Sequence, residues 1–426
     1  MVTKAETTWR KVKLEEVLEL IIDHRGKTPK KLGGNWSQRG IPAISAKNIK
    51  NGKVINESDI RYVSEELYNK WMPEKLEAGD ILLTSEAPLG ELFYLKKVAD
   101  YCLSQRLFAL RSNQNKLYSR FLYYFLLSPE GQHELTRRIS GTAAEGIRQA
   151  ELRQVEIGYP ENLDEQKRIA DVFSTFDDKI ELNNKISQNL EQMAQAIFKE
   201  WFIEFRFPGY KKVKMVNSEL GKIPEGWKVK KIKDIANIQK GLSYSSSQIN
   251  NSLVGLPMLN LASFLRGGGF NPSGIKYYTG KYKDADLVKS GDIIIAMTDL
   301  TSNREVIGHP ARVPLYSHWD KILISLDVCA VKTEEILRDF LYYLMMRKDF
   351  AFRMASSAGG TNIAHLSKPT IEDYIFVLPD RALLKQFHEL VDPAVTSKNK
   401  HEIENQKLAA LRDLLLPKLM SGEVRV

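Results

Sequence analysis

The chain has 426 residues, of which 43% are hydrophobic and 27% are charged, as in an ordinary soluble protein of about two to four domains. No apolar run approaches about 18 residues, which excludes a membrane-spanning helix, and the first residues, MVTKAETTWRKVKLEE, contain no apolar signal core. Cys102 and Cys329 each lie in an apolar, strand-like run, so we expect two buried thiols instead of a disulfide. These features together lead us to expect a cytoplasmic protein.

The net charge of +9 is concentrated in two regions. Residues 1–160 carry 25 Lys and Arg against 20 Asp and Glu (+5), and residues 207–379 carry 23 against 16 (+7). Residues 161–206 carry 6 against 10 (−4), and residues 380–426 carry 8 against 7 (+1). Two basic regions separated by an acidic segment favour contact with a polyanion such as nucleic acid. The alternative is a basic surface that serves only solubility.

Residues 1–163 are predicted to form a mixed α/β domain. Strand-like runs occur at residues 41–46, 79–84, 91–95 and 103–110, and residues 121–126 have the apolar spacing of a helix. Ser140-Gly141-Thr142 is expected to cap a short helix that ends before Tyr159-Pro160. Trp9 is expected to pack on the core of this domain, and base stacking is its less favoured role.

Residues 164–206 are predicted to form one long amphipathic helix, because they contain no Pro or Gly. From Gln166 to Trp201 such a helix would span roughly 54 Å at about 1.5 Å per residue. Asn183 interrupts its apolar seam with a polar group, a common way to fix the register of paired helices. The seam residues are Ile169, Phe173, Phe176, Ile180, Ile186, Leu190, Met193, Ile197 and Trp201.

Residues 207–380 are predicted to form a second domain that repeats the first. Five matches keep the same order, at offsets of 212 to 219 residues. They pair Trp9-Arg10 with Trp227-Lys228, Gly40-Ile41-Pro42 with Gly255-Leu256-Pro257, Gly79-Asp80-Ile81 with Gly291-Asp292-Ile293, Phe121-Leu122-Tyr123-Tyr124 with Phe340-Leu341-Tyr342-Tyr343, and Gly141-Thr142 with Gly360-Thr361. The repeated Gly-Asp pairs resemble metal carboxylates, but a turn that leads into the following apolar strand is the favoured interpretation.

Residues 381–426 are predicted to supply a second long helix, the partner of the first. Leu384, Phe387 and Val391 start its apolar stripe, and Pro393 is expected to break or restart it. Ile403, Leu408, Leu411, Leu415 and Leu419 continue the stripe. The chain is thus predicted to be a duplicated unit of one domain and one helix.

Several motifs of catalysis are missing from the sequence. It has no G-x-x-x-x-G-K-[ST] phosphate loop, no G-x-G-x-x-G after a strand, no G-x-S-x-G elbow and no Asn-Pro-Pro-Tyr type motif. The seven histidines show no ligand spacing such as H-x-x-x-H, so no metal site is expected. Two similar basic domains without a catalytic constellation indicate a protein that reads a polymer and does not itself catalyse a reaction.

Three stretches resemble the specificity (S) subunits of Type I restriction-modification enzymes. They are Tyr159-Pro160 with Asp164-Glu165-Gln166, the linker from Phe205-Arg206-Phe207-Pro208-Gly209-Tyr210 to Ser218-Glu219-Leu220-Gly221-Lys222-Ile223-Pro224-Glu225-Gly226-Trp227, and the segment from Leu415 to Val426. The resemblance covers essentially the whole chain. One departure is that Arg381 and Lys385-Gln386 stand where the first half has Asp164-Glu165-Gln166, so the acidic residue of this signature is missing from the second half.

The resemblance implies an α/β fold with two repeated target recognition domains, separated by two long antiparallel helices that form a coiled-coil-like spacer with a pseudo-twofold internal repeat. Each domain would read one half of a bipartite sequence in double-stranded DNA. The implied protein partners are two copies of a DNA-methyltransferase subunit and the restriction (motor) subunits. S-adenosylmethionine and ATP with Mg would be bound by those partners, so no cofactor is expected in this chain.

Base-reading residues are expected in the polar loops of the two domains. Arg and Asn are favoured because they bond the edges of guanine and adenine with two hydrogen bonds. The candidates in the first domain are Arg25, Lys27, Lys30, Asn48, Lys50, Ser85, Arg106, Thr142 and Arg148. Those in the second are Lys240, Tyr244, Asn260, Arg266, Thr298, Asn303, Arg304, Thr361 and Asn362. For each of them, a solvated surface role is the alternative.

Two other functions compete with this one. A stand-alone regulator with two DNA-reading domains is the nearest alternative, although regulators usually pair identical subunits. A scaffold that binds only proteins is the other, and the positive charge of the two domains argues against it.

Overall fold

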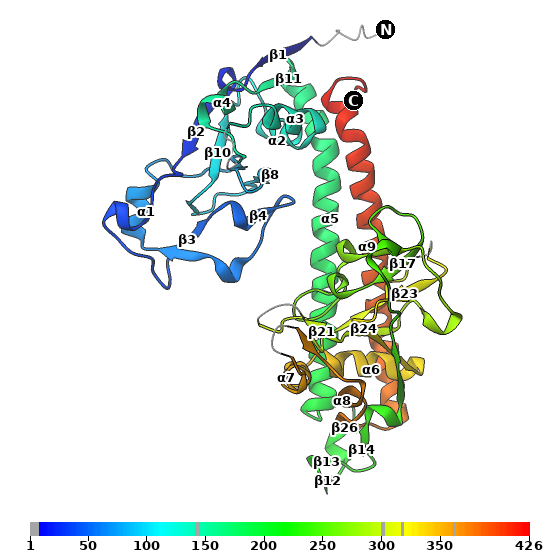
Figure 1. Cartoon of the computed structure of the whole chain (residues 1–426). Helices are drawn as coiled ribbons and strands as arrows, with labels where there is room; N and C mark the ends of the chain where they lie inside the picture. The colour runs from blue at the N-terminus through cyan, green and yellow to red at the C-terminus, as the bar shows by residue number, and fades with distance from the viewer. Residues whose placement is uncertain (1–7, 141–144, 300–302, 317–318, 361–362) are drawn as a thin grey trace. The chain divides into compact units, whose positions relative to one another are not determined.

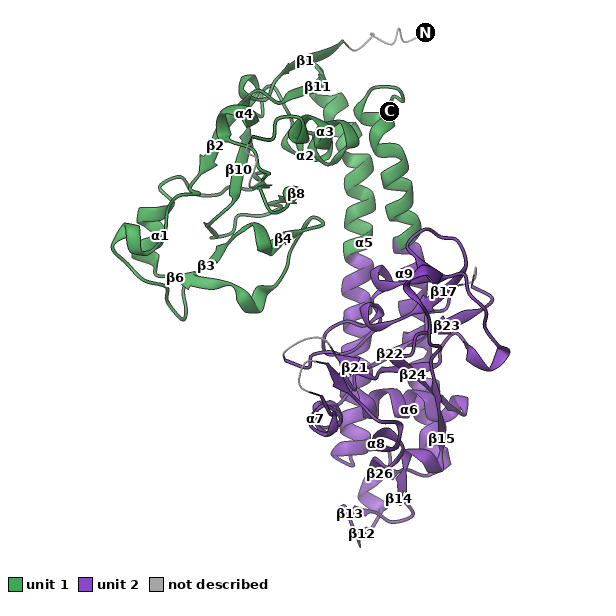
Figure 2. Ribbon diagram, viewed as in Figure 1, with its two compact units in different colours: residues 1–181, 406–426 green, residues 182–405 purple. Residues whose placement is uncertain are grey.

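The computed structural model describes residues 8–140, 145–299, 303–316, 319–360 and 363–426. The chain is a mixed α/β protein, as predicted, and it divides into two compact units (Figures 1 and 2). Unit 1 contains residues 1–181 and 406–426, and unit 2 contains residues 182–405. Within the described residues, no helix has the length and apolarity that a membrane span requires.

Unit 1 is built on a four-stranded antiparallel sheet in the order β2-β10-β7-β8. Its strands are β2 (Leu18–Asp23), β7 (Ile81–Ser85), β8 (Leu89–Tyr94) and β10 (Leu107–Ser112). A second sheet has the order β6-β3-β9, with β3 (Ile41–Ile44), β6 (Arg61–Val63) and β9 (Cys102–Leu103). Two strand pairs complete the unit: β1 (Trp9–Lys13) with β11 (Glu156–Pro160), and β4 (Ile49–Lys50) with β5 (Lys53–Val54).

The four-stranded sheet of unit 1 separates two cores, because successive side chains of a strand point to opposite faces. Ile81 and Leu83 pack in the core that contains α2 (Ser119–Leu127), whereas Leu82 packs in the core that contains β3 and β9. The other helices of the unit are α1 (Glu65–Trp71), α3 (Pro129–Thr136) and α4 (Gln149–Arg153). Trp9 packs edge-on against Phe121 of α2, with ring centroids 6.2 Å apart, which confirms its predicted place on the core.

Unit 2 repeats this plan with the strand order β15-β24-β20-β22. The strands are β15 (Ala236–Lys240), β20 (Ile293–Ala296), β22 (Pro310–Arg312) and β24 (Val328–Thr333). A five-stranded sheet follows the order β16-β18-β17-β23-β19, with β16 (Ile249–Asn250), β17 (Leu256–Leu259), β18 (Lys276–Tyr278), β19 (Leu287–Val288) and β23 (Ile322–Ile324). The remaining pairs are β12 (Met215–Ser218) with β13 (Gly221–Pro224), β14 (Lys228–Lys231) with β26 (Ile375–Leu378), and β21 (Thr298–Asp299) with β25 (Ala364–His365).

The helices of unit 2 also match those of unit 1. α6 (Glu335–Met345) covers one face of the four-stranded sheet, and α7 (Lys348–Ser357) and α8 (Lys368–Glu372) follow it along the chain. Ile293 and Ile295 pack on the α6 side of β20, whereas Ile294 packs on the side of β23. The alternation seen in β7 is therefore present again in β20.

The two Gly-Asp pairs form turns, as predicted. Gly79 and Gly291 have positive φ (97° and 84°), and each Asp accepts a backbone N–H three residues earlier, Asp80 from Glu77 (2.8 Å) and Asp292 from Lys289 (2.7 Å). Both thiols are buried and unpaired, so this prediction is also confirmed. The cap predicted at Ser140-Gly141-Thr142 is wrong, because the N-cap residue of α4 is Arg148; Gly141 and Thr142 lie outside the described residues.

The first long helix is α5 (Leu163–Phe198), continued by one π-helical turn (Lys199–Ile203). Its predicted seam holds in its first part, where Ile169 and Phe173 are buried. Further along, the prediction holds for Ile197 and Trp201, which pack partly buried against the core of unit 2, but it is wrong for Met193, which is 61% exposed next to the buried Ala194. Ala194 takes this place because it packs in the same core of unit 2 as Phe198.

The second long helix is α9 (Arg381–Met420), and it runs through Pro393 without a break. The prediction of a break at Pro393 is therefore wrong. Phe387 and Val391, in the turns before the proline, are fully buried, and this packing offsets the loss of one backbone hydrogen bond. Leu411 was also placed on the buried stripe, but it is 48% exposed.

Candidate nucleic-acid interface

A polar cavity of unit 1 lies where four loops meet at one end of its central sheet. Arg25 lies in the loop after β2, Ser85 is the last residue of β7, and Glu86 follows it. Gln105 and Arg106 form the turn between β9 and β10, and residues 146–148 precede α4. The cavity has a volume of about 380 Å³ and is also lined by Ser140. Four predicted DNA-binding residues, Arg25, Ser85, Arg106 and Arg148, thus line one site.

The backbone fixes this site through three hydrogen bonds. The Ser85 N–H donates to the Arg106 carbonyl (2.9 Å), the Ile147 N–H donates to the Ser85 carbonyl (2.9 Å), and the Ser140 N–H donates to the Gly146 carbonyl (2.9 Å). Gly146 is required by the close approach of the loops, since a Cβ there would lie 2.9 Å from the Cβ of Glu86 and 3.0 Å from the Ser85 carbonyl oxygen. These three backbone hydrogen bonds, which join Ser85 to Arg106, Ile147 to Ser85 and Ser140 to Gly146, form a backbone frame that holds the side chains of the loops in fixed positions.

The charged side chains of the site differ in how firmly they are held. Arg25 makes two hydrogen bonds to Asp23 (2.8 and 2.9 Å) and one to the Ile147 carbonyl (3.1 Å), and its guanidinium stacks on Phe108. Among the described residues, the side chain of Arg106 makes one ion pair, with Glu86 (2.9 Å), and it remains 51% exposed; Arg148 is exposed. The side chain of Arg25 is thus held in one position at the edge of the cavity, whereas Arg106 can leave Glu86 and bind a ligand instead.

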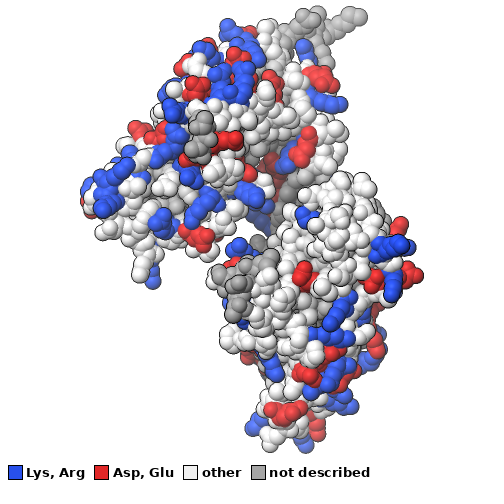
Figure 3. Space-filling view, in the orientation of Figure 1, with Lys and Arg blue, Asp and Glu red and all other residues white. Residues whose placement is uncertain are grey.

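The other candidates of unit 1 lie apart from the cavity. The Lys27 ammonium donates to the Trp71 carbonyl (2.7 Å). Asn48 is buried, and its amide accepts from Ser45 and donates to the Ile55 carbonyl (3.3 Å), so in this conformation it reaches no ligand. Lys30 and Lys50 are exposed, and Thr142 lies outside the described residues. Lys and Arg are spread over the visible face of unit 1, with Asp and Glu among them (Figure 3).

Unit 2 carries the same backbone frame. The Met297 N–H donates to the Asp327 carbonyl (2.7 Å), the Leu366 N–H donates to the Met297 carbonyl (2.7 Å), and the Gly359 N–H donates to the His365 carbonyl (3.0 Å). Met297 and Asp327 therefore stand where unit 1 has Ser85 and Arg106. The candidate Thr298 lies in this frame and donates its hydroxyl to Asp327 (2.9 Å). Tyr244 is half-buried, and its burial and then the charge of Asp327 raise the pKa of its phenol.

The remaining candidates of unit 2 are not gathered into this frame. Asn260 caps a short helix, accepting from the Ala262 N–H (2.8 Å) and donating to the Gly274 carbonyl (2.9 Å). Arg266 pairs with Glu305 (3.1 Å), and Arg304 donates to the Ala355 carbonyl. Lys240 and Asn303 are exposed, and Thr361 and Asn362 lie outside the described residues.

Two residues of the repeated frame, Glu86 and Asp327, are not among the residues predicted from the sequence. A signal for Asp327 is present, because Leu103-Ser104-Gln105-Arg106-Leu107 aligns with Ile324-Ser325-Leu326-Asp327-Val328. Both serines donate their N–H across a parallel strand pair, to Ile44 (2.8 Å) and Leu259 (2.8 Å), so the two turns are equivalent. The predicted residues are Arg, Lys, Asn, Ser, Thr and Tyr, and no acidic residue is among them.

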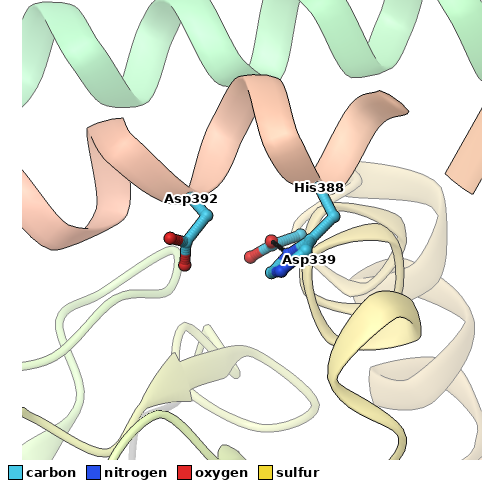
Figure 4. Close-up of side chains that lie close together, drawn as sticks. All are labelled: Asp339, His388 and Asp392. Atoms are coloured by element: carbon cyan, nitrogen blue, oxygen red, sulfur yellow. Dashed lines mark hydrogen bonds and ion pairs between the residues drawn. The ribbon is translucent and has the colours of Figure 1, made fainter. Parts of the chain in front are cut away.

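A separate group in unit 2, Asp339, His388 and Asp392, gathers side-chain ligand atoms within 4.8 Å (Figure 4). His388 Nδ1 lies 2.6 Å from an Asp339 oxygen, and Arg312 binds the other oxygen at 2.7 Å. Burial alone would lower the pKa of Arg312, but Asp339 raises it, so this guanidinium stays charged. Arg312 already balances the negative charge of Asp339. The bond between Asp339 on α6 and His388 on α9 therefore serves to connect these two helices.

The chain matches the family model described as Type I restriction modification DNA specificity domain twice, at residues 6–192 and 224–405. It is 28% identical to the Type I restriction enzyme MjaIX specificity subunit of Methanocaldococcus jannaschii, over 99% of this chain and 95% of that protein. It is 24% identical to the Type I restriction enzyme HindI specificity subunit of Haemophilus influenzae, over 82% of this chain and 87% of that protein. The crystal structure of the Type-I restriction-modification system S subunit from M. genitalium has the same fold, with a TM-score of 0.57, 16% identity and 98% of both chains covered.

Proposed function

Because the chain belongs to the family of Type I restriction modification DNA specificity domains, we propose that it is the DNA-recognition subunit of a Type I restriction-modification complex. It reads a bipartite target in double-stranded DNA, one half-site per domain. The observation that carries this proposal is the repeated frame: one set of backbone bonds presents Arg106 and Glu86 in unit 1 but Asp327 and Thr298 in unit 2. A scaffold that keeps its backbone and changes its polar groups suits the reading of two different base sequences.

The proposed parts are two target recognition domains, at residues 1–163 and 207–380, and two spacer helices, at residues 164–206 and 381–426. An antiparallel pairing of the helices is supported by bonds whose residue numbers rise along α5 and fall along α9. In unit 1, Asp177 accepts from Arg412 (2.7 Å). In unit 2, Asn183 donates to Asn405 (2.9 Å) and Ser187 lies 3.3 Å from His401.

The proposed protein partners are two copies of a DNA-methyltransferase subunit and the restriction (motor) subunits, which would bind S-adenosylmethionine and ATP with Mg. The long helices support such docking, because they expose large apolar side chains. The exposed fraction is 51% for Leu182 and 61% for Met193 on α5, and 48% for Leu411 and 60% for Leu414 on α9. The chain itself is proposed to be non-catalytic.

A domain exchange tests the proposed reading. Residues 9–160 are replaced by the equivalent domain of a relative, the chimera is assembled with its methyltransferase subunit, and methylated sites are mapped. One half of the recognised sequence is expected to change, and a change in both halves would reject reading by independent domains. Sequence-specific binding that needs no methyltransferase subunit would instead favour a stand-alone regulator.

Partner docking has its own test. The double variant Leu411→Glu and Leu414→Glu is expected to reduce co-purification of the methyltransferase subunit, because it places charge on an apolar docking face. Val98→Glu is a matched control, since Val98 is 69% exposed but lies outside both helices. Equal loss in the control and the double variant would argue against docking on α9.

A further inference from the structure

The turn between β9 and β10 in unit 1 and the turn between β23 and β24 in unit 2 hold opposite charges at the same position. Each turn follows a serine whose N–H is bonded across a parallel strand pair, and each ends one residue before the central strand. The last turn residue is Arg106 in unit 1 and Asp327 in unit 2. The carbonyl of each accepts a backbone bond from the end of the neighbouring strand, from Ser85 or from Met297. The two side chains therefore start from equivalent points.

Within the part of the chain that the structure describes, each of the two side chains is held by one polar side chain. Arg106 pairs with Glu86 at 2.9 Å while both are partly exposed, and Asp327 accepts from the Thr298 hydroxyl at 2.9 Å. An exposed ion pair contributes little to stability, because water screens it. A ligand that offers Arg106 two acceptors can therefore replace Glu86. In unit 2, the Thr298 bond orients the carboxylate and leaves oxygen lone pairs free to accept further donors.

The backbone of Arg106 supports a functional role for this position. Its φ is +66°, in the left-handed region that L residues other than Asn and Asp rarely adopt. Glycine would remove this strain, yet the position holds a long cationic side chain beside the polar cavity that contains Ser85. The Ser85 hydroxyl is buried and has no hydrogen-bond partner among the described residues. The cavity thus presents a hydroxyl that no other described residue uses, beside the guanidinium of Arg106.

We propose that Arg106 and Asp327 are matched specificity-determining residues, Arg106 for a guanine in the half-site of unit 1 and Asp327 for a cytosine in that of unit 2. Guanine offers two acceptors, O6 and N7, in the major groove, which match the paired donors of a guanidinium. Cytosine offers the N4 amino group there, which matches a carboxylate. This assignment rests on the proposed DNA-recognition function.

The test measures which sequences the assembled complex of this chain and its methyltransferase subunits selects from random double-stranded DNA. Arg106→Gln is expected to lose the guanine preference at one position of one half-site, by roughly 5- to 150-fold, the usual effect of one mismatched base pair. Asp327→Asn is expected to lose a cytosine preference of similar size in the other half-site. In each case the opposite half-site stays unchanged.

The matched controls make the same two substitutions, Arg to Gln and Asp to Asn, at positions outside the repeated frame. Arg10→Gln removes an arginine that pairs with Glu161 (3.0 Å) on the β1–β11 ladder, and Asp349→Asn removes an aspartate that pairs with Arg347 (2.7 Å) on α7. Neither is expected to alter a base preference. Glu86→Gln frees Arg106 and is expected to keep the guanine preference while raising affinity by no more than about fivefold.

Three results would overturn the assignment. The first is an unchanged preference in Arg106→Gln or Asp327→Asn. The second is a loss of affinity in Arg106→Gln that is equal for all sequences, which would identify a phosphate contact. The third is loss of the guanine preference in Glu86→Gln. If the wild-type complex itself selects no sequence, the proposed function fails, whereas a selective wild type with unaltered variants rejects only this inference.

Discussion

The two units have the same arrangement of strands and backbone hydrogen bonds but different side chains at two places: the polar site and the start of each long helix. Gln166, near the start of α5, is fully buried and makes three bonds: it accepts from the Tyr118 N–H (2.7 Å) and donates to the Lys116 (3.1 Å) and Pro160 (2.8 Å) carbonyls. Near the start of α9, the buried residues are Leu383 and Leu384. The junction between a long helix and its domain can therefore be held by a polar residue, Gln166 in unit 1, or by apolar residues, Leu383 and Leu384 in unit 2.

The aromatic anchor of unit 2 should give the largest effect. Phe387 of α9 is fully buried, and its ring centroid lies 4.9 Å from that of Phe202, in the π-helical turn after α5, and 6.0 Å from that of Phe198, at the end of α5. Phe387→Ala is expected to destabilise unit 2 by about 3–5 kcal/mol, because it opens a cavity inside this cluster. Urea denaturation followed by tryptophan fluorescence measures the loss. An effect below about 1 kcal/mol would show that the junction of unit 2 does not depend on this ring.

The polar anchor of unit 1 should give the next largest effect. Gln166→Leu removes the partner of the part-buried Tyr118 N–H and Lys116 carbonyl and of the buried Pro160 carbonyl. It is expected to cost about 2–4 kcal/mol, even though leucine fills a similar volume. Gln386→Leu is the matched control: Gln386 lies in the sequence equivalent of the Asp-Glu-Gln signature but is exposed, so a change within about 0.5 kcal/mol is expected. Equal effects of the two substitutions would contradict the structural comparison.

The close approach of the loops in unit 1 predicts a smaller effect. Gly146→Ala is expected to cost about 1–3 kcal/mol, since its new methyl group would meet the Glu86 Cβ at 2.9 Å. Gly359→Ala, in the frame of unit 2, adds a methyl group with no atom within 4 Å and is expected to stay within about 0.5 kcal/mol. Amide hydrogen exchange of Ile147 is a second measurement, because its N–H closes the frame of unit 1.

The smallest predicted effect is a dependence on pH that both units share. Burial lowers the pKa of His24 in unit 1 and of His309 in unit 2 below the usual 6.5. Each neutral imidazole contributes stability above pH 6.5, and this stability is lost as the pH falls toward the lower pKa of the folded state. Denaturation midpoints between pH 7.5 and about pH 5 should therefore fall less in His24→Gln and His309→Gln than in the wild type. Parallel curves for variants and wild type would contradict this.

The sequence was sufficient to predict the repeat, the mixed α/β domains, the two long helices and the buried Asn183, because each depends on local periodicity or on residue order. The exposure of Met193 and the continuity of α9 through Pro393 depend on tertiary packing, which overrides local preference. At the polar site, the sequence was sufficient to propose Arg25, Ser85, Arg106 and Arg148 as binding residues, but not to predict that their loops surround one cavity. Their meeting depends on bonds between distant residues, such as Ile147 with Ser85.

The packing of the end of α9 in unit 1 has a consequence for the order of folding during synthesis. Leu416, Leu419 and Met420 belong to the same core as Phe121 and Phe173, and a Cβ at Gly422 would lie 2.9 Å from the Trp9 ring. These helical residues leave the ribosome after every other member of that core, whereas unit 2 is already synthesised once residue 405 has emerged. The unit that is translated first is therefore the last to close its core. Until then, its apolar surface is open to chaperones and to other copies of the chain.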